Sequence, residues 1–188
     1  MTHSLERWRL RTAVESDVPA LEILIPLSVH VLQAPYYSTA QRQAALGPVF
    51  GVDRQLIHDQ TYFVVEDQQQ IVACGGWSRR KSFFGGNDGQ FADAPLDPAR
   101  DAARIRAFFV HPEWSRRGFG RRLLWACEEA IHTAGFRKIE LVATLAGEPL
   151  YAAHAYAVVN RYEIRLSGDL FLAVVRMGKS IERGGSRA

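Results

Sequence analysis

Residues 106–124 read Arg106-Ala-Phe-Phe-Val110-His-Pro-Glu-Trp-Ser115-Arg-Arg-Gly118-Phe-Gly120-Arg-Arg-Leu-Leu124. An apolar run rich in β-forming residues comes first, Gly118 and Gly120 follow, and a helical pattern begins directly after them. Backbone N–H groups at a helix N-terminus are unpaired and attract anions, and glycines let a phosphate group approach the main chain closely. This stretch therefore predicts a strand, a phosphate-binding loop and a helix in direct succession.

Arginine residues gather around the same loop. The segment 104–122 holds six arginines and one acid, Glu113, so its local charge is +5, while the whole chain carries +3. Arg104 and Arg106 alternate along the predicted strand, where they can face solvent or pair with carboxylates. The arginines nearest the loop, which we expect to face an anionic ligand, are Arg116, Arg117 and Arg121.

The glycine loop lies inside a predicted βαβ unit. Apolar periodicity predicts a strand over 103–110, a helix over 121–134 that ends at Gly135, and a strand over 139–144. Such a connection makes the two strands parallel neighbours in one sheet. The apolar stripe of the helix docks it on that sheet and holds the loop in place.

The rest of the chain continues the alternation of helices and strands. The predicted elements are a strand over 8–13, a helix from Ser16-Asp17 that Pro26 kinks or divides, short helices over 38–46 and 53–58, a hairpin of 62–66 and 71–78 with a bulge at Gly75-Gly76, a helix over 150–156, and a final hairpin of 162–166 and 170–177. We interpret the segment 82–101, rich in Gly, Asp and Pro, as a lid or insertion. The expected fold class is α/β (α+β), with a mixed, twisted central sheet flanked by helices.

The composition fits one globular domain over residues 1–188, with its core at about 8–179 and a polar tail over 180–188. The chain is 47% hydrophobic and 23% charged, which excludes a disordered chain and a disulfide-rich miniprotein. No run approaches the roughly 18 apolar residues of a membrane span, and the N-terminus lacks an apolar signal-peptide core, so we expect a cytoplasmic protein without membrane contact. Cys74 and Cys127 are too far apart for a C-x-x-C site, and no metal is expected.

Two other glycine-loop motifs fit less well. A P-loop requires Gly-Lys-Ser or Gly-Lys-Thr, which is absent. A dinucleotide fingerprint requires a third glycine where Leu123 stands and normally follows the first strand of its fold, although Glu140 supplies an acid about 20 residues on. The dinucleotide interpretation is therefore weakened rather than excluded.

These residues resemble the GCN5-related N-acetyltransferase (GNAT) superfamily, whose acetyl-CoA signature is Q/R-x-x-G-x-G/A between a strand and a helix. Here the signature reads Ser115-Arg-Arg-Gly118-Phe-Gly120. The hairpin at 62–78, the strand at 103–110 and the final hairpin follow the family's order, and the resemblance covers about residues 8–179. It implies that acetyl-CoA is the cofactor and that its pyrophosphate lies among Arg116, Arg117, Gly118, Phe119, Gly120 and Arg121.

The segment 144–156 resembles the family's N-x-x-P-F-Y-x-x-x-G-F region, with Tyr151 at the tyrosine position. In many members this tyrosine protonates the departing thiolate of coenzyme A, and the resemblance implies that role for Tyr151. Three family residues or pairs are replaced here, by Ser115, Ala146 and Ala155-Tyr156. The last replacement should affect the helix end, because alanine tolerates a left-handed conformation less well than glycine.

The resemblance also implies that a neutral amine attacks the thioester directly in a ternary complex, without an acyl-enzyme. Main-chain groups near Phe109 and Val110, where the family's two central parallel strands separate, would bind pantetheine and polarise the thioester carbonyl. Trp77 and Arg79, at the end of a strand, are candidates for lining the acceptor pocket. The candidates for the general base are Glu66, Glu148, His111 and a chain of waters.

The leading hypothesis is an N-acetyltransferase whose acceptor is a small-molecule amine or a protein amine. One alternative is a non-catalytic acyl-CoA-binding module that senses CoA or regulates a partner. Another is a nucleic-acid-binding domain that uses the arginine cluster, but aromatic residues are not interleaved on a basic helix, so no nucleic-acid partner is expected. The family often pairs through sheet edges or terminal strands, and a homodimer is an expectation from the resemblance alone.

Overall fold

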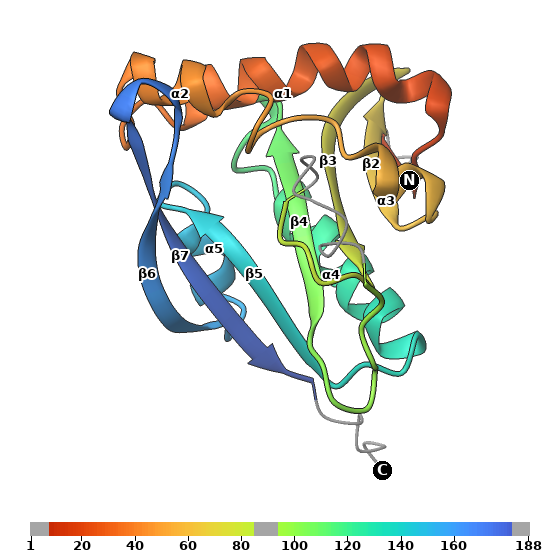
Figure 1. Ribbon diagram of the computed structural model, residues 1–188. Helices are drawn as coiled ribbons and strands as arrows, with labels where there is room; N and C mark the ends of the chain where they lie inside the picture. The colour runs from red at the N-terminus through yellow and green to blue at the C-terminus, as the bar shows by residue number, and fades with distance from the viewer. Residues whose placement is uncertain (1–7, 85–93, 182–188) are drawn as a thin grey trace.

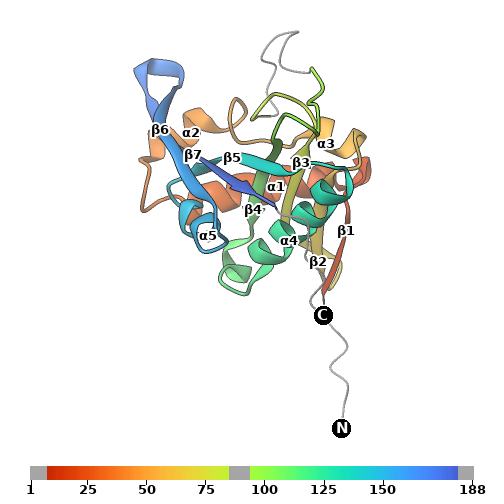
Figure 2. The ribbon, with the colours of Figure 1, turned by 90° about the horizontal axis from the view of Figure 1, so that it is seen from below.

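The computed structural model describes residues 8–84 and 94–181, and these residues form a seven-stranded sheet with helices on both faces (Figures 1 and 2). Neighbouring strands follow the order β1-β2-β3-β4-β5-β7-β6, and all pairs are antiparallel except β4 and β5, which are parallel. The strands are β1 Trp8–Thr12, β2 Tyr62–Asp67, β3 Gln70–Ser78, β4 Ala103–Val110, β5 Lys138–Thr144, β6 Ala157–Arg165 and β7 Phe171–Ser180. The α-helices are α1 Val18–Leu32, α2 Thr39–Ala45, α3 Arg54–His58, α4 Phe119–Thr133 and α5 Glu148–Ala152. The predicted fold class is confirmed.

Strands β4 and β5 pair only at one end. Their register covers residues 103–105 of β4 and 139–141 of β5. Beyond these residues, β4 continues its pairing with β3, and β5 continues its pairing with β7. Figure 1 shows the two strands diverging toward the end of the sheet where α1 lies. The sheet is therefore split in its middle rather than at its edge.

A bulge lies in β4 where the two strands part. Cys74 pairs with Phe109 and Gly76 with Arg106, so two β4 residues, 107 and 108, stand opposite Gly75 alone. Ala107 adopts a positive φ of 61°. A Cβ on Gly75 would lie 2.4 Å from the ring of Phe108, so the close approach requires glycine. The predicted bulge at Gly75-Gly76 is confirmed, with the extra residue on the partner strand.

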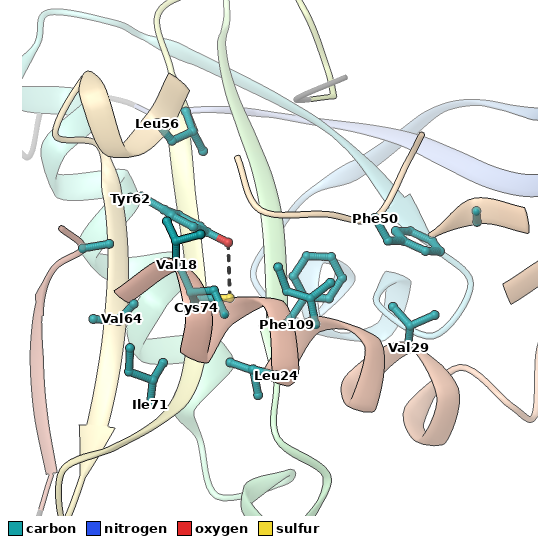
Figure 3. Close-up of a cluster of buried hydrophobic side chains, with 14 of the residues drawn as sticks. Val18, Leu24, Val29, Phe50, Leu56, Tyr62, Val64, Ile71, Cys74 and Phe109 are labelled. Carbon is teal, nitrogen blue, oxygen red and sulfur yellow. Dashed lines mark hydrogen bonds between the residues drawn. The ribbon is translucent and has the colours of Figure 1, made fainter. Parts of the chain in front are cut away.

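The two faces of the sheet bury separate apolar clusters. Figure 2 shows α2 and α3 on one side of the sheet and α4 and α5 on the other. The cluster under α1, drawn in Figure 3, contains the fully buried Tyr62, whose hydroxyl lies 3.3 Å from Cys74 Sγ and 3.2 Å from the carbonyl oxygen of Ala107. This core therefore also holds the β4 bulge. On the other face, α4 buries the stripe Leu123, Leu124, Cys127 and Ile131.

Helix α1 remains continuous through Pro26, so of the two predicted alternatives, a kink or a division, the division does not occur. Proline removes one helical hydrogen bond, but apolar side chains on both sides of it anchor the two halves to the sheet. The anchoring side chains are Leu21, Leu24, Ile25 and Val29.

Other element boundaries differ from the predicted ones by a few residues. Helix α4 begins at Phe119 because Gly118 is its N-cap, and α5 spans only Glu148–Ala152, so Tyr156 lies outside it. The capping box predicted at Ser38 is confirmed, since its hydroxyl accepts a hydrogen bond from the Gln41 N–H.

Part of the predicted lid at 82–101 and most of the predicted tail fall outside the described residues, namely 85–93 and 182–188. At residue 83, in the described start of the predicted lid, the ring centroid of Phe83 lies 4.2 Å from the Arg104 guanidinium and 5.3 Å from the Arg176 guanidinium. Within 8–84 and 94–181, no helix combines the length and apolar character that a membrane span needs.

Ala155 follows α5 with a positive φ of 65°, the left-handed conformation that glycine usually supplies at a helix end. An L-residue in this conformation costs about 1–2 kcal/mol. Glycine avoids this strain, but it also raises the conformational entropy of the unfolded chain, which cancels part of the gain in stability. We expect Ala155→Gly to raise the free energy of unfolding by about 0.5–1 kcal/mol, measured by urea denaturation.

The matched control is Gly135, which follows the C-cap of α4 and has a φ of 90°. There Gly135→Ala should lower the free energy of unfolding by about 1 kcal/mol. If Ala155→Gly left stability unchanged or lowered it, the strain assigned to Ala155 would be refuted.

Candidate functional site

The loop before α4 has the backbone shape of an anion-binding site. Arg116 and Gly118 adopt positive φ angles of 61° and 86°, and Gly118 is the N-cap of α4. Alternating left- and right-handed residues turn successive N–H groups toward one side. The Arg122 N–H bonds to the Gly118 carbonyl at 3.1 Å, which leaves the N–H groups of residues 119–121 without a helical acceptor. These N–H groups, with the positive end of the helix dipole, favour a phosphate ligand.

The arginines near this loop divide into two groups. Arg104 and Arg106 pair with acids, at 2.6 Å from Glu140 and 2.7 Å from Asp53, and Arg106 also lines the cavity beside β4. The guanidinium of Arg122 stacks on Trp8, 4.0 Å from a ring centroid. The arginines that line the cavity beside the loop are Arg116, Arg117 and Arg121, the three expected from the sequence.

A cavity of about 720 Å³ begins at this loop and continues through the gap between β4 and β5. Residues from α5 line it beside the loop, residues 107–110 and 142–144 of the diverging strands line its middle, and residues of α1 line its far part. The cavity brings together all the predicted cofactor and catalytic residues: Phe109, Val110, Arg116, Arg117, Gly118, Phe119, Gly120, Arg121 and Tyr151.

The main chain of β4 offers polar groups in the middle of this cavity. Ala107 and Phe108 lie outside the paired registers that β4 forms with β3 and β5. The Val110 N–H donates to Ser28 Oγ at 3.3 Å, so a side chain of α1 engages one of the two predicted positions. The sequence analysis did not name Phe108 as a lining residue. The Gly75-Gly76 pair of the neighbouring strand nevertheless signals the bulge that takes Phe108 out of the pairing between β3 and β4.

Tyr151 extends from α5 into the cavity with only 7% of its surface exposed. Its ring packs against Phe108 and Tyr156, at centroid distances of 6.1 and 5.8 Å. Burial, and secondarily the nearby thiol of Cys127, raises the pKa of the Tyr151 phenol above its usual value. Tyr151 is therefore a neutral hydrogen-bond donor throughout the physiological pH range.

The structure does not bring Trp77 and Arg79 to the cavity. Trp77 is buried under α4, where its ring lies 6.2 Å from that of Phe136, and the Arg79 guanidinium lies 5.6 Å from the Trp77 ring. Their positions give no support to the predicted role in acceptor binding. Side chains alternate between the two faces along a strand, so a side chain at the strand end faces only one side of the sheet, and for Trp77 this is the side that α4 covers.

None of the three side chains considered as the general base lines the cavity. Glu66 bonds to Arg11 at 2.9 Å, and Glu148 bonds to Arg161 at 2.6 Å. The His111 ring packs on Trp114 at 4.5 Å. Among the described lining residues there is no Asp, Glu or His, and the described part of the chain holds no cluster of three groups suited to a metal ion.

Residues 28–157 match the model of the acetyltransferase (GNAT) family, which spans more than half of the chain. The chain belongs to the GNAT family. This membership agrees with the glycine loop, the split sheet and the position of Tyr151. No curated protein sequence is significantly similar to the chain.

Solved GNAT structures share this fold at low sequence identity. A GCN5-related N-acetyltransferase from Rhodopseudomonas palustris superposes with a TM-score of 0.68 at 18% identity, covering 96% of this chain and 100% of that one. A PaiA N-acetyltransferase from Thermoplasma acidophilum, in complex with coenzyme A, gives 0.62 at 12% identity, covering 92% and 98%. The ribosomal-protein-S18-alanine N-acetyltransferase from Escherichia coli gives 0.61 at 14% identity, covering 96% and 98%.

Neighbouring arginines at the start of α4 provide a matched test of the candidate anion site. We expect Arg121→Ala to weaken acetyl-CoA binding roughly tenfold, because it removes a cation that lines the cavity. Arg122→Ala should leave the dissociation constant unchanged, because that side chain stacks on Trp8. Calorimetric titration measures both constants. Equal losses of acetyl-CoA affinity in the two variants would mean that the overall positive charge of this region, and not a defined site, attracts the cofactor.

Proposed function

We propose that this GNAT protein transfers the acetyl group of acetyl-CoA to a primary amine by direct attack within a ternary complex. The observation that carries the proposal is the single cavity that joins the anion-binding loop to the far part of the cavity, beside α1, through the split between β4 and β5. Such a passage lets two ligands meet in the middle of the sheet, where main-chain groups and Tyr151 lie.

The residues present fit acetyl-CoA. Three arginines and the N–H groups of residues 119–121 suit a pyrophosphate, and the lining strands suit an extended amide-containing chain. A Cβ on Gly120 would lie 3.2 Å from Leu150 Cδ2, so glycine lets the start of α4 pack closely against α5. At Gly118 only the Arg121 guanidinium would lie within 4 Å of a Cβ, at 3.9 Å, so the main chain of the loop is open to a bulky anion there.

Acetyl-CoA supplies a thioester carbonyl that an amine can attack and a sulfur that can leave. The residues at the β4 bulge contribute main-chain polarity beside that position, because Ala107 and Phe108 have no partner in the described ladders. A fixed donor in a site that excludes water stabilises developing negative charge better than solvent does. The sheet, held by its bulge, would thereby pre-orient the reacting groups.

The Tyr151 hydroxyl is the proposed proton donor to the departing sulfur. A phenol in water already has a higher pKa than a thiol, about 10 against about 8.5, and burial raises the pKa of Tyr151 further. Full proton transfer to a free thiolate is therefore uphill. We infer that Tyr151 donates while the carbon–sulfur bond breaks, when the sulfur is held in place.

Both cysteines are poor candidates for an acyl-enzyme. Cys74 and Cys127 are buried free thiols outside the cavity lining. Burial raises the pKa of both, that of Cys74 to about 12, so each stays in the protonated, weakly nucleophilic form. This supports direct attack by the amine.

Substitution of Tyr151 tests its role. Tyr151→Phe should lower kcat roughly a hundredfold and leave the acetyl-CoA dissociation constant unchanged, because the ring packing is kept while the proton donor is lost. In the wild type, the raised pKa of Tyr151 predicts no loss of kcat from phenol ionisation between pH 8 and about 10. Steady-state assays of thiol release measure kcat and its pH dependence, and calorimetric titration measures the dissociation constant. Unchanged kcat in Tyr151→Phe would remove Tyr151 from the mechanism.

The cofactor site has its own test, which also separates an enzyme from a sensor. Gly120→Asp adds a negative charge to the first turn of α4, which suits the helix dipole but repels a pyrophosphate, so acetyl-CoA affinity should fall roughly a hundredfold. Ala152→Asp adds the same charge at an exposed position outside the cavity lining and should change nothing. Failure of the wild type to bind acetyl-CoA would refute the proposal. Binding without thiol release for any amine would favour the non-catalytic module.

The acceptor class, small-molecule or protein amine, is part of the proposal. The homodimer and the cytoplasmic location stay predictions.

A further inference from the structure

Two arginines and one glutamate, the Arg-Glu-Arg cluster, lie together on the sheet face opposite α4 and α5. Arg104 of β4 and Arg176 of β7 both donate to Oε2 of Glu140 on β5, at 2.6 and 2.7 Å. Side chains alternate along a strand, and the strand neighbours of all three residues belong to the apolar cluster under α4. The three side chains therefore share the face that α4 and α5 leave open, the side of the sheet on which Figure 2 shows α2 and α3.

The Arg-Glu-Arg cluster holds two positive charges and one negative charge. Both guanidinium groups share one carboxylate oxygen, and an arginine side chain does not lose its proton in a protein. Burial lowers the pKa of Arg104, and the charge of Arg176 acts in the same direction, while Glu140 opposes both effects. The two cations thus repel each other, and an added anion would relieve that repulsion.

Arg176 has a guanidinium nitrogen that Glu140 does not use. Its Nη2 donates to Glu140, and its Nε is buried without a hydrogen-bond partner. Its Nη1 forms no hydrogen bond with the described residues and, unlike Nε, is open to solvent. The side chain as a whole is 35% exposed. Arg176 can therefore bind a further anion while Glu140 holds it in place.

The Arg-Glu-Arg cluster adjoins the cavity where β4 and β5 part. Phe83 lines the cavity, and its ring centroid lies within 5.3 Å of both guanidinium groups of the cluster. Val142 lines the gap on β5 and is the direct cross-strand partner of Arg176. The Cα atoms of such partners are about 4.5–5.5 Å apart, and their side chains share one face of the sheet. An anion on Arg176 would therefore lie beside the gap, on the face opposite α4.

Arg106 lines the same part of the cavity but is already neutralised. It pairs with Asp53 at 2.7 Å, and it donates to the main-chain carbonyl oxygens of residues 82 and 84. Its side chain is 5% exposed, against 35% for that of Arg176. Of these two arginines, Arg176 is the one that a ligand can reach.

We propose that Arg176 binds a carboxylate of the acceptor, and that the acceptor is a primary amine with a carboxylate a few bonds from its nitrogen. The inference rests on the proposed function, in which acetyl-CoA lies on the glycine loop and the amine reaches the gap from the other face of the sheet. A guanidinium and a carboxylate form charge-assisted hydrogen bonds. Arg176 takes no part in the bonds that form and break, so it acts on acceptor affinity rather than on kcat.

Three pairs of small amines test the chemical class. The pairs are glycine and glycinamide, β-alanine and β-alaninamide, and 4-aminobutanoate and 4-aminobutanamide, each differing in one charge and little in size. A nearby carboxylate makes an amine more basic, so without an anion site the amide would supply more of the neutral, reactive amine. We expect kcat/KM for the carboxylate to exceed that for the amide at least fivefold in one pair or more. Failure of every carboxylate to reach this ratio would overturn the inference.

Substitution tests the residue. Arg176→Gln removes the charge, so KM for the preferred carboxylate should rise roughly tenfold, while KM for its amide and the acetyl-CoA dissociation constant stay unchanged. Arg176→Lys keeps the charge without the forked geometry and should recover part of the loss. Arg165→Gln is the matched control and should change none of these values, because that side chain is 74% exposed on β6 and pairs with Asp169.

The possible failures point to different conclusions. Equal rises of KM for the carboxylate and the amide in Arg176→Gln would mean that the Arg-Glu-Arg cluster only holds three strands together, and would overturn the inference. Thiol release with the amides alone would refute the anion site and leave the acetyltransferase proposal standing. Absence of acetyl-CoA binding by the wild type would instead refute the proposed function itself.

Discussion

The separation of β4 from β5 after three paired residues is the constraint on which the rest of this structure depends. It requires a bulge at Ala107 and Phe108, and the bulge in turn requires a glycine at position 75, because any Cβ there would collide with the Phe108 ring. The Tyr62 hydroxyl holds the carbonyl of Ala107 from within the core. A defect in the sheet is thus stabilised by packing on one face and becomes a passage between the two faces.

A buried ion pair supports the far side of this passage. Asp53 and Arg106 are almost fully enclosed, and burial raises the pKa of Asp53 even though the Arg106 guanidinium lies against it. Arg106 also binds the carbonyl oxygens of Ser82 and Phe84, which places two aromatic rings along the cavity. Removing one partner would leave a charge buried without compensation, a defect worth about 3–5 kcal/mol. The pair therefore shapes the pocket rather than binding its contents.

The sequence was most informative where structure is local. The glycine loop, the helix behind it, the Ser38 capping box and the Gly75-Gly76 bulge depend on residues a few positions apart, and all four were predictable. Trp77 and Arg79, which a strand end suggested for the acceptor pocket, do not line the cavity, since the face that a strand presents depends on partners far away in the chain. The cavity as a whole carries no local signal either, because α1, β4, β5 and α5, which are far apart in the sequence, line it together.

The two parts of the cavity are encoded by different pieces of the chain. The anion-binding part comes from residues 116–121 and the start of α5, whereas the apolar part comes from the end of α1, residues 49–50 and residues 83–84. A substitution in the second group leaves the glycine loop and its arginines untouched. If the apolar part holds the acceptor, as proposed, its shape can change one short segment at a time while the residues beside the glycine loop stay constant.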